Sequence, residues 1–263
     1  MNSFNKILCD FRECFNNFHI WIIIPFYDIK ARYRRTVIGP FWLTLGTATT
    51  ILGMGAVWGS IFGVSLQEFL PYVAAGMVIW TFISSILNES CYVFTSQRSI
   101  IHNVKVSFFI HIMNMISRNI IIMFHNFFVI IAVFVICRHP LNLEFLWVFP
   151  GFILLILNSF WVGIFIGIVA TRYRDIAAVI TNISTLIMIA TPIMWQADRL
   201  QGNRKIIATL NPFAHMISII RDPLLGQSPS LESYFIIIGI LVIGLLLSLW
   251  LYKKFVHRIV FWI

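Results

Sequence analysis

Charged residues are scarce in this chain of 263 residues. Asp, Glu, Lys and Arg make up 11% of it, whereas 59% of the residues are hydrophobic. A soluble domain of average composition contains about 25% charged residues. Because so few charges are available to cover a water-exposed surface, lipid must solvate much of the chain. The composition therefore predicts an integral membrane protein and excludes an ordinary soluble enzyme.

Motifs for nucleotide hydrolysis and for other hydrolytic chemistry are also absent. None of the six lysines is followed by Ser or Thr, which excludes a phosphate-binding loop of the Walker type. The sequence contains no His-Glu-x-x-His and no Gly-x-Ser-x-Gly, and its four cysteines form no Cys-x-x-Cys pair. We therefore expect no catalytic residue, no metal site and no cofactor in this chain, so its energy must come from a neighbour.

A single basic surface is missing too, although the net charge is +9. The 19 Lys and Arg residues lie between long neutral runs, which is the distribution that sets membrane topology. Proteins that bind nucleic acid instead gather their basic residues on one face. The charge pattern thus argues against a nucleic-acid partner and indicates the lipid bilayer.

Six apolar runs are long enough to cross that bilayer. At 1.5 Å per residue, about 20 helical residues span a hydrocarbon core of about 30 Å. These runs predict an all-α integral membrane fold with one permease domain over residues 1–263 and a six-span bundle over 37–252. The expected spans are Val37–Phe62, Tyr72–Phe94, Val106–Cys137, Leu146–Thr171, Ile176–Trp195 and Tyr234–Tyr252.

Two segments differ from these spans. Asn2–His19 has apolar residues at helical spacing and charges elsewhere on the wheel, which predicts an amphipathic helix along the membrane interface. A basic stretch follows it up to residue 35. Between spans five and six, Gln196–Ser233 is only partly apolar and contains three prolines. We expect two short re-entrant helices there, on the periplasmic side, rather than a full crossing.

The orientation follows from the basic residues. With six spans, one side of the membrane holds the N-terminal segment, the second and fourth loops and the tail 253–263. These parts contain 14 Lys and Arg residues, and the opposite side contains five. Since positive charge concentrates on the cytoplasmic side, both termini are predicted to be cytoplasmic.

Glu89 and Arg118 lie within or beside predicted spans. A charge at the bilayer centre costs about 2.5–3.5 kcal/mol on insertion scales, so each side chain needs a partner or water. Both lie toward the cytoplasmic ends of consecutive spans, and we expect them to approach one another as an intramembrane charge pair. Independent extension of each side chain to the interface is the alternative.

Two pairs of glycines predict close helix packing. Gly55 and Gly59, and likewise Gly163 and Gly167, are separated by one helical turn. Small residues at this spacing allow the backbones of neighbouring membrane helices to approach closely.

Four segments of the chain resemble one known family. They are Asp28-Ile-Lys-Ala-Arg-Tyr-Arg-Arg-Thr-Val-Ile-Gly-Pro-Phe-Trp42, Phe69–Trp80, Arg172-Tyr-Arg-Asp-Ile176 and Leu210-Asn-Pro-Phe213. Over nearly its whole length the chain is similar to the permease (transmembrane) subunits of polysaccharide-exporting ABC transporters of the type-2 class. Among these it most resembles the exporters of O-antigen and related surface polysaccharides.

The resemblance implies partners and a location. It implies a homodimer in the bacterial inner membrane, two cytosolic ATPase subunits that carry ATP and Mg, and an undecaprenyl-linked polysaccharide as substrate. It further implies that the interface helix and a cytoplasmic coupling helix at Gln97–Lys105 transmit movement from the ATPase. The coupling residues would be Arg98, Ile101, His102 and Lys105.

The expected substrate path starts at the basic stretch and continues into the first span. Aromatic faces and hydroxyls suit a sliding sugar polymer, and spans one and five are the expected walls of the pore. The candidates for this path are Tyr33, Phe41, Trp42, Thr44 and Thr47. Arg32, Arg34 and Arg35 are candidates to hold the pyrophosphate of the lipid carrier, with topology-setting contacts to anionic headgroups as the alternative.

Two rival functions stay open at this point. One is an ABC permease for a drug or a lipid, against which the segment Asp28–Trp42 argues. The other is a membrane-embedded acyltransferase acting on lipid-linked sugars. Such an enzyme needs His, Asp or Glu residues that converge near one membrane face. The scattered candidates for it are Glu89, His102, His111 and His125.

Overall fold

The computed structural model describes residues 3–39, 41–104, 106–140, 142–196 and 206–263. Throughout these residues the regular structure is helical, which confirms the all-α prediction. The helices are α1 (Ser3–Asn16), α2 (Phe18–Arg32), α3 (Phe41–Phe62), α4 (Leu66–Ser90), η1 (Thr95–Gln97), α5 (Arg98–Asn103), α6 (Phe108–Cys137), η2 (Leu143–Trp147), α7 (Val148–Arg172), α8 (Ile176–Ala190), α9 (Ile206–Thr209), α10 (Pro212–Leu224) and α11 (Leu231–Trp262).

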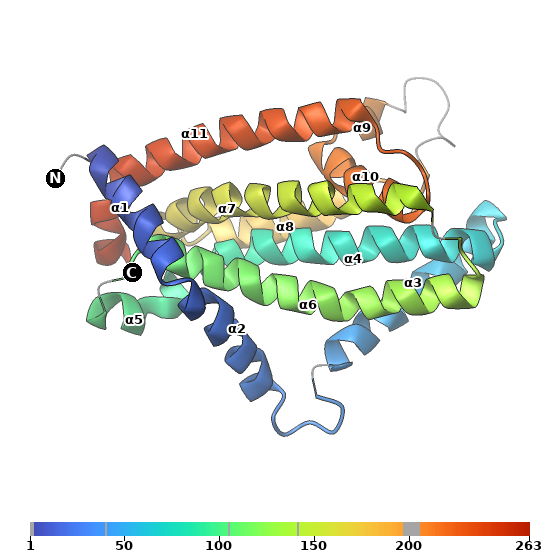
Figure 1. Cartoon of the computed structure of the whole chain (residues 1–263), viewed down its shortest axis with the longest axis horizontal. Coiled ribbons are helices and arrows are strands. Elements are labelled where there is room, and N and C mark those ends of the chain that lie inside the picture. The colour runs from blue at the N-terminus through green and yellow to red at the C-terminus, as the bar shows by residue number, and fades with distance from the viewer. Residues whose placement is uncertain (1–2, 40, 105, 141, 197–205) are drawn as a thin grey trace.

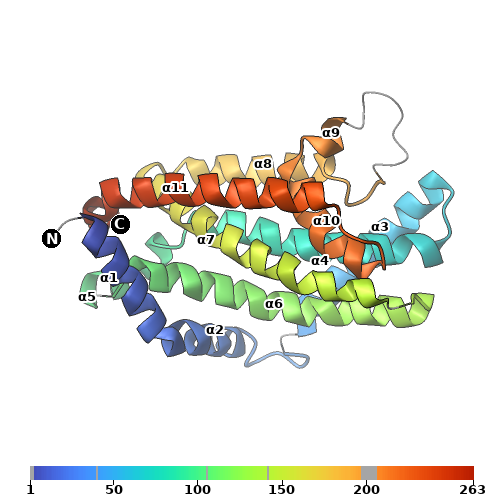
Figure 2. The same cartoon turned by 45° about the horizontal axis from the view of Figure 1, so that its top comes forward.

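The long helices lie side by side in one elongated bundle (Figures 1 and 2). Helix α4 packs against α3, α6 and α7, and α11 packs along α7. Both chain ends, α1 and α5 gather at one end of the bundle, which we call the termini end. Helices α9 and α10 lie toward the opposite end, which we call the far end.

Among the described residues, five helical segments are long and apolar enough to cross a membrane. They are α3, α4, α6, the combined segment Leu143–Arg172, and α11. The expected fifth span, Ile176–Trp195, is helical only over the 15 residues of α8. A helix of that length is about 22 Å long, less than a hydrocarbon core of about 30 Å. The count of six spans therefore stays a prediction.

Pro192 explains why α8 is short. The residue before a proline is driven from the helical region into the extended region, because the ring clashes with its backbone. Thr191 has φ −90° and ψ 137°, and α8 ends there. The apolar sequence pattern continues to Trp195, but the helix ends at Ala190.

Helix α4 is the centre of the bundle. In its apolar stretch 78% of the residues are buried inside the fold, against 17% in α3. In α8 only Ser184 is buried. Helices α3 and α8 therefore have wide faces that no other described residue covers.

The glycine pairs pack as the sequence predicts. A Cβ atom on Gly163 would lie 2.8 Å from Cγ2 of Ile112 on α6, and one on Gly167 would lie 2.7 Å from Cγ1 of Val93. Gly55 similarly faces the side chain of Leu70 on α4. Both pairs thus serve close packing within one chain.

Gly151 makes a closer approach that involves backbone. A Cβ there would lie 2.8 Å from the carbonyl oxygen of Ile219 on α10. We expect Gly151→Ala to destabilise the protein by about 1–3 kcal/mol, because an added methyl overpacks the contact between α7 and α10. Thermal unfolding in detergent measures the loss.

Gly239→Ala is the matched control for that substitution. A Cβ at Gly239, on α11, would have no described atom within 4 Å. Alanine favours a helix over glycine by about 1 kcal/mol, so this variant should melt at the same temperature or higher. Equal melting temperatures for Gly151→Ala and the wild type would contradict the close approach of α7 and α10.

The segment between the last two apolar helices contains two short helices, α9 and α10. Asn211 begins α10 by accepting a hydrogen bond from the backbone N–H of Phe213 at 2.9 Å, and Pro212 occupies the first turn. Helix α10 packs against α4, α7 and α11. Residues 197–205 of this segment lie outside the described residues. Re-entry of these helices into the membrane stays a prediction.

The N-terminal region contains one helix more than the sequence analysis predicts. Within the expected segment Asn2–His19 the structure has a helix, α1, over Ser3–Asn16, and its place at the membrane interface stays a prediction. A second helix, α2, follows from Phe18 to Arg32 and packs against α6. The basic stretch therefore lies mostly on a helix, and the chain leaves it at Tyr33.

Candidate functional site

Polar contacts hold α1 onto the termini end of the bundle. The Tyr252 hydroxyl of α11 donates a 2.7 Å hydrogen bond to Asp10 Oδ2. The backbone N–H of Ser107, just before α6, donates to Glu13 Oε1 at 3.1 Å. Asp10 and Tyr252 are both buried. Helix α1 is thus tied to both α6 and α11.

Burial raises the pKa of Asp10 above its usual 3.8, although the hydrogen bond from Tyr252 and the charges of Lys6 and His257 act in the opposite direction. A raised pKa means that the folded protein favours the protonated carboxyl. The resulting stability is fully present below the unfolded pKa and is lost as the pH rises through the folded value.

Asp10→Asn tests this linkage. Asparagine stays neutral and keeps an oxygen that accepts a hydrogen bond from Tyr252. The stability of the variant should therefore not decrease as the pH rises from about 4 to neutrality. We expect it to melt at or above the wild-type temperature at pH 7. Melting curves across that pH range in detergent check this, and parallel profiles for the two proteins would refute the assignment.

The expected coupling segment lies beside this junction. Helix α5 is a separate six-residue helix between α4 and α6. Arg98 and His102 are exposed, whereas Ile101 is half-buried and packs against the core. Lys105 lies outside the described residues. The structure therefore leaves the polar side chains of α5 free to contact another protein at the termini end.

Glu89 and Arg118 form an ion pair. Arg118 Nη2 donates to Glu89 Oε2 at 2.7 Å, and Asn119 Nδ2 donates to the same oxygen at 2.7 Å. The side chains of Arg118 and Glu89 are 22% and 34% exposed. The structure thus brings together the two charges that the sequence analysis paired, and they join the end of α4 to α6.

The residues of the expected substrate path are spread over α2 and α3. Tyr33 ends α2, and Phe41 and Trp42 are exposed at the start of α3. The Thr44 hydroxyl donates to the His125 carbonyl of α6 at 3.3 Å, and the Thr47 hydroxyl donates to the Leu43 carbonyl at 3.1 Å. Both hydroxyls satisfy backbone carbonyls, which leaves their oxygens able to accept from a ligand.

The three arginines at the end of α2 have different surroundings. Arg32 lines a cavity of about 250 Å³ that also contains the Glu89–Arg118 pair. Arg34 and Arg35 are exposed and do not line it. His111 and Asn114, which the sequence analysis did not select for the path, complete the polar lining from α6.

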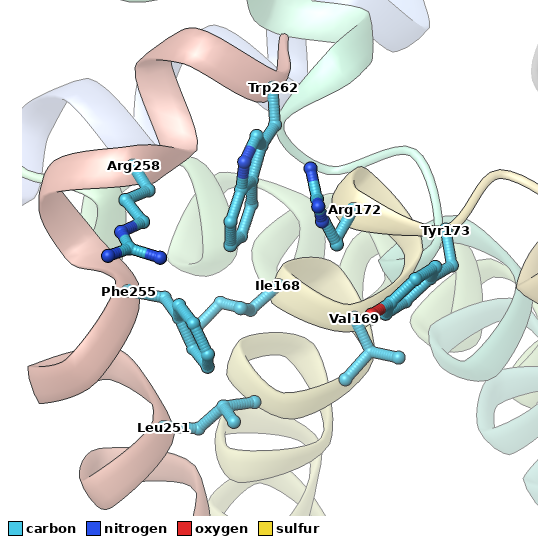
Figure 3. A pocket seen from close by; sticks show the side chains of 8 residues that line it. All are labelled: Ile168, Val169, Arg172, Tyr173, Leu251, Phe255, Arg258 and Trp262. Atoms are coloured by element: carbon cyan, nitrogen blue, oxygen red, sulfur yellow. The ribbon is translucent and has the colours of Figure 1, made fainter.

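A larger pocket, of about 390 Å³, lies between the ends of α7 and α11 (Figure 3). Arg172 and Arg258 stand on either side of Trp262, and the Arg172 guanidinium lies 5.2 Å from the centre of the indole ring. Neither arginine has a carboxylate partner among the described residues. These guanidinium groups can therefore pair with carboxylates or phosphates brought by another molecule.

At the far end, Arg221 of α10 is the central contact. It is 7% exposed, its Nη1 donates to the Pro192 carbonyl at 2.6 Å, and its guanidinium lies 4.2 Å from the centre of the Tyr72 ring. Asp222 Oδ1 accepts from Arg221 Nε at 3.3 Å, and the Tyr72 hydroxyl also donates to the Pro192 carbonyl. Arg221 thus joins α10 to α4 and to the end of α8.

The four residues considered for an acyltransferase do not share one cavity. Glu89 and His111 line the cavity beside Arg32, but His102 lies on α5 and the His125 ring bonds the Ile121 carbonyl. Among the described residues, no group of three or more His, Cys, Asp or Glu side chains is placed to hold a metal ion.

Comparison with known families identifies the kind of protein that carries this arrangement. A family model described as "ABC-2 type transporter" matches residues 26–225. The chain belongs to this family. The match runs from α2 to the end of α10, so it includes the polar cavity and Arg221.

Curated relatives of this ABC-2 transporter chain carry one name. Two proteins of Klebsiella pneumoniae called "O-antigen export system permease protein RfbA" are each 22% identical to it. The first match covers 87% of this chain and 90% of the relative. The second covers 76% of this chain and 78% of the relative. A Myxococcus xanthus protein of the same name is 19% identical over 79% of this chain and 80% of its own length.

These matches confirm the family resemblance on which the sequence analysis relied. Together with the apolar helices, membership of the ABC-2 family shows a multi-pass membrane protein of the transport permease type.

Proposed function

We propose that this chain is the transmembrane subunit of an ABC transporter that exports a lipid-linked polysaccharide across the bacterial inner membrane. The observation that carries the proposal is the similarity, along 87% of the chain, to a protein named as an O-antigen export permease. The similarity extends over 90% of that protein's own length, and the family match over residues 26–225 includes the segment around α5 and the α9–α10 segment, which supports one function rather than a shared fragment.

Two copies of the chain form the pore in this proposal. Helices α3 and α8 are the walls, because no described residue of the protomer covers their wide faces. These faces carry exposed hydroxyls at Thr49 and Thr50 on α3 and at Thr181 and Thr185 on α8. Phe41 and Trp42 add exposed rings at the start of α3. Hydroxyls and aromatic faces suit sugars without fixing them tightly.

A separate ATPase drives the cycle. The termini end presents α5 with Arg98 and His102 exposed and Ile101 beneath them, and α1 is tied to α6 and α11 through Glu13 and Asp10. ATP and Mg bind on the partner subunits. Closure of the ATPases pushes α5 and α1, and this movement separates the pore walls.

The termini end faces the cytoplasm in this proposal. The ends of α7 and α11 line one pocket, and Ser107 contacts α1, so the second loop, the fourth loop and both termini lie together. Six crossings, with α8 as the shortest, account for this arrangement. At the end of α2, Arg32, Arg34 and Arg35 are then available to the phosphates of the carrier lipid or of headgroups.

Deletion of the gene tests the export function. We expect surface polymer to disappear and lipid-linked polymer to accumulate inside the cell, since synthesis continues without a path outward. Immunoblots of surface polysaccharide and extraction of lipid-linked glycan measure the two effects, and plasmid-borne wild type is the control. An unchanged amount of surface polymer would contradict the proposed export function.

A further inference from the structure

The pocket of about 390 Å³ between the ends of α7 and α11 has a charged end and an apolar end (Figure 3). Arg172, Arg258 and Trp262 lie near the C-terminal ends of the two helices and line the charged end. Val169 and Leu251 precede them on the same helices and lie opposite Trp262 in the view of Figure 3. Because α7 and α11 pack side by side, the lining changes from charged to apolar along the bundle.

Every polar side chain in this lining can donate a hydrogen bond. The polar groups are the guanidinium groups of Arg172 and Arg258, the indole N–H of Trp262 and the hydroxyl of Tyr173. Among the described residues, no Asp, Glu, Asn or Gln lines the pocket, and the ion pairs of the bundle lie elsewhere. Both arginines are exposed and therefore accessible. Two positive charges without a carboxylate select an anionic ligand.

The helix dipoles alone do not account for this pocket. Arg172 and Arg258 each lie near the C-terminal end of a helix, where a positive charge offsets the dipole. This effect acts on each helix separately and sets no requirement on the space between them. It explains neither the pocket that the two guanidinium groups share nor its apolar end.

The lengths of the helices place the pocket at the membrane surface. Helix α11 has 32 residues and is about 48 Å long, whereas a bilayer is about 40–45 Å thick with its headgroups included. Lys254 Nζ lies 5.1 Å from the centre of the Trp250 ring, and both residue types are typical of the interface. Arg172 ends the apolar segment Leu143–Arg172. The charged end of the pocket thus lies level with lipid headgroups, and the apolar end lies level with acyl chains.

We propose that this pocket binds one anionic phospholipid of the bilayer, with its phosphate on Arg172 and Arg258 and one acyl chain along Val169 and Leu251. Basic pockets between membrane helices bind anionic headgroups in this way. An acidic segment of another protein would pair with the same arginines but would leave the apolar end uncovered. The proposal goes beyond polysaccharide export and requires neither the polymer nor the ATPase. A lipid held there joins α7 to α11 and should stabilise the bundle.

The test titrates the full-length chain, purified in detergent, with dioleoyl phosphatidylglycerol and counts bound lipid by native mass spectrometry. Dioleoyl phosphatidylethanolamine should bind more weakly, because its ammonium group faces two guanidinium groups. We expect Arg172→Gln and Arg258→Gln each to weaken binding of phosphatidylglycerol about fivefold. A charge-assisted hydrogen bond contributes about tenfold or more, and the exposure of these side chains lowers the expected effect.

Lys253→Gln is the matched control, because Lys253 is exposed on α11 and does not line the pocket. Its affinity for phosphatidylglycerol should stay within about twofold of wild type. Phosphatidylglycerol should also raise the melting temperature of the wild type and of Lys253→Gln more than that of either arginine variant. Melting curves without lipid confirm that each variant is folded.

Three results would overturn the proposal. The first is equal binding of phosphatidylglycerol by the wild type and both arginine variants. The second is equal binding of the two lipids by the wild type. The third is binding of glycerol 3-phosphate as tight as that of phosphatidylglycerol, which would identify a site for free phosphate. Arginine variants that bind lipid normally but lose a co-purifying protein would assign the pocket to that protein instead.

Discussion

Reversal of one charge, by Arg118→Glu, is expected to abolish surface polymer. In the wild type, Glu89 Oε2 accepts hydrogen bonds from Arg118 and Asn119. The substitution places a second carboxylate beside Glu89 at the end of α4. Separating a buried ion pair costs about 3–5 kcal/mol, and the partial exposure of this pair lowers the cost to about 2 kcal/mol. Like-charge repulsion adds to that loss, so export should fall at least tenfold.

The double variant Glu89→Arg with Arg118→Glu identifies the interaction. It restores opposite charges across α4 and α6, and we expect it to recover a substantial part of the surface polymer and of the melting temperature. Lys30→Glu, an exposed reversal on α2, controls for the change in net charge. A double variant that is no better than the single one would show that the two side chains act independently.

Replacement of Arg221 by methionine is expected to have the second large effect. The Pro192 carbonyl would lose a 2.6 Å charge-assisted bond, and the Tyr72 ring would lose the guanidinium 4.2 Å from its centre. Loss of these contacts should destabilise the far end by about 3 kcal/mol. Because α10 then loses its links to Tyr72 of α4 and to Pro192 after α8, export should fail even where the chain still inserts.

Thermal unfolding and protease sensitivity of the purified variant measure this effect. Cleavage should become faster in the segment from residue 206 to 225, while the rest of the bundle stays protected. Arg138→Met is the control, since Arg138 is exposed where α6 ends. If Arg221→Met melts like Arg138→Met and exports normally, Arg221 does not hold α10 in place.

Much of the bundle could be predicted from the sequence, because lipid imposes a simple rule on apolar length. The helices α3, α6 and α7 fall within a few residues of the expected spans, whereas α4 begins six residues before its expected span and α11 continues ten residues beyond Tyr252, to Trp262. Two further differences have local causes. Pro192 stops α8, and α2 places its apolar and basic residues one after the other along the helix rather than on opposite faces, so the usual amphipathic period is missing.

Only part of the candidate site could be predicted from the sequence, because most of its contacts join residues that are far apart in the chain. Glu89 and Arg118 are charges in an apolar environment, and such charges require partners. The bond from Tyr252 to Asp10 joins residues 242 positions apart, and Arg221 reaches Pro192 from another element. Such contacts form only when the helices pack together, so no local sequence pattern predicts them. His111 could not be selected from the sequence, because only the packing of α6 beside α2 and η1 brings it into the cavity lined by Arg32.

In the proposed function, a separate ATPase powers this membrane permease. Purification of the tagged chain from native membranes, followed by measurement of ATP hydrolysis, tests it most directly. We predict that an ATPase subunit co-purifies in equal amounts and that hydrolysis disappears when that subunit is removed. A chain that purifies alone from those membranes and exports polymer without a nucleotide-hydrolysing partner would contradict the account.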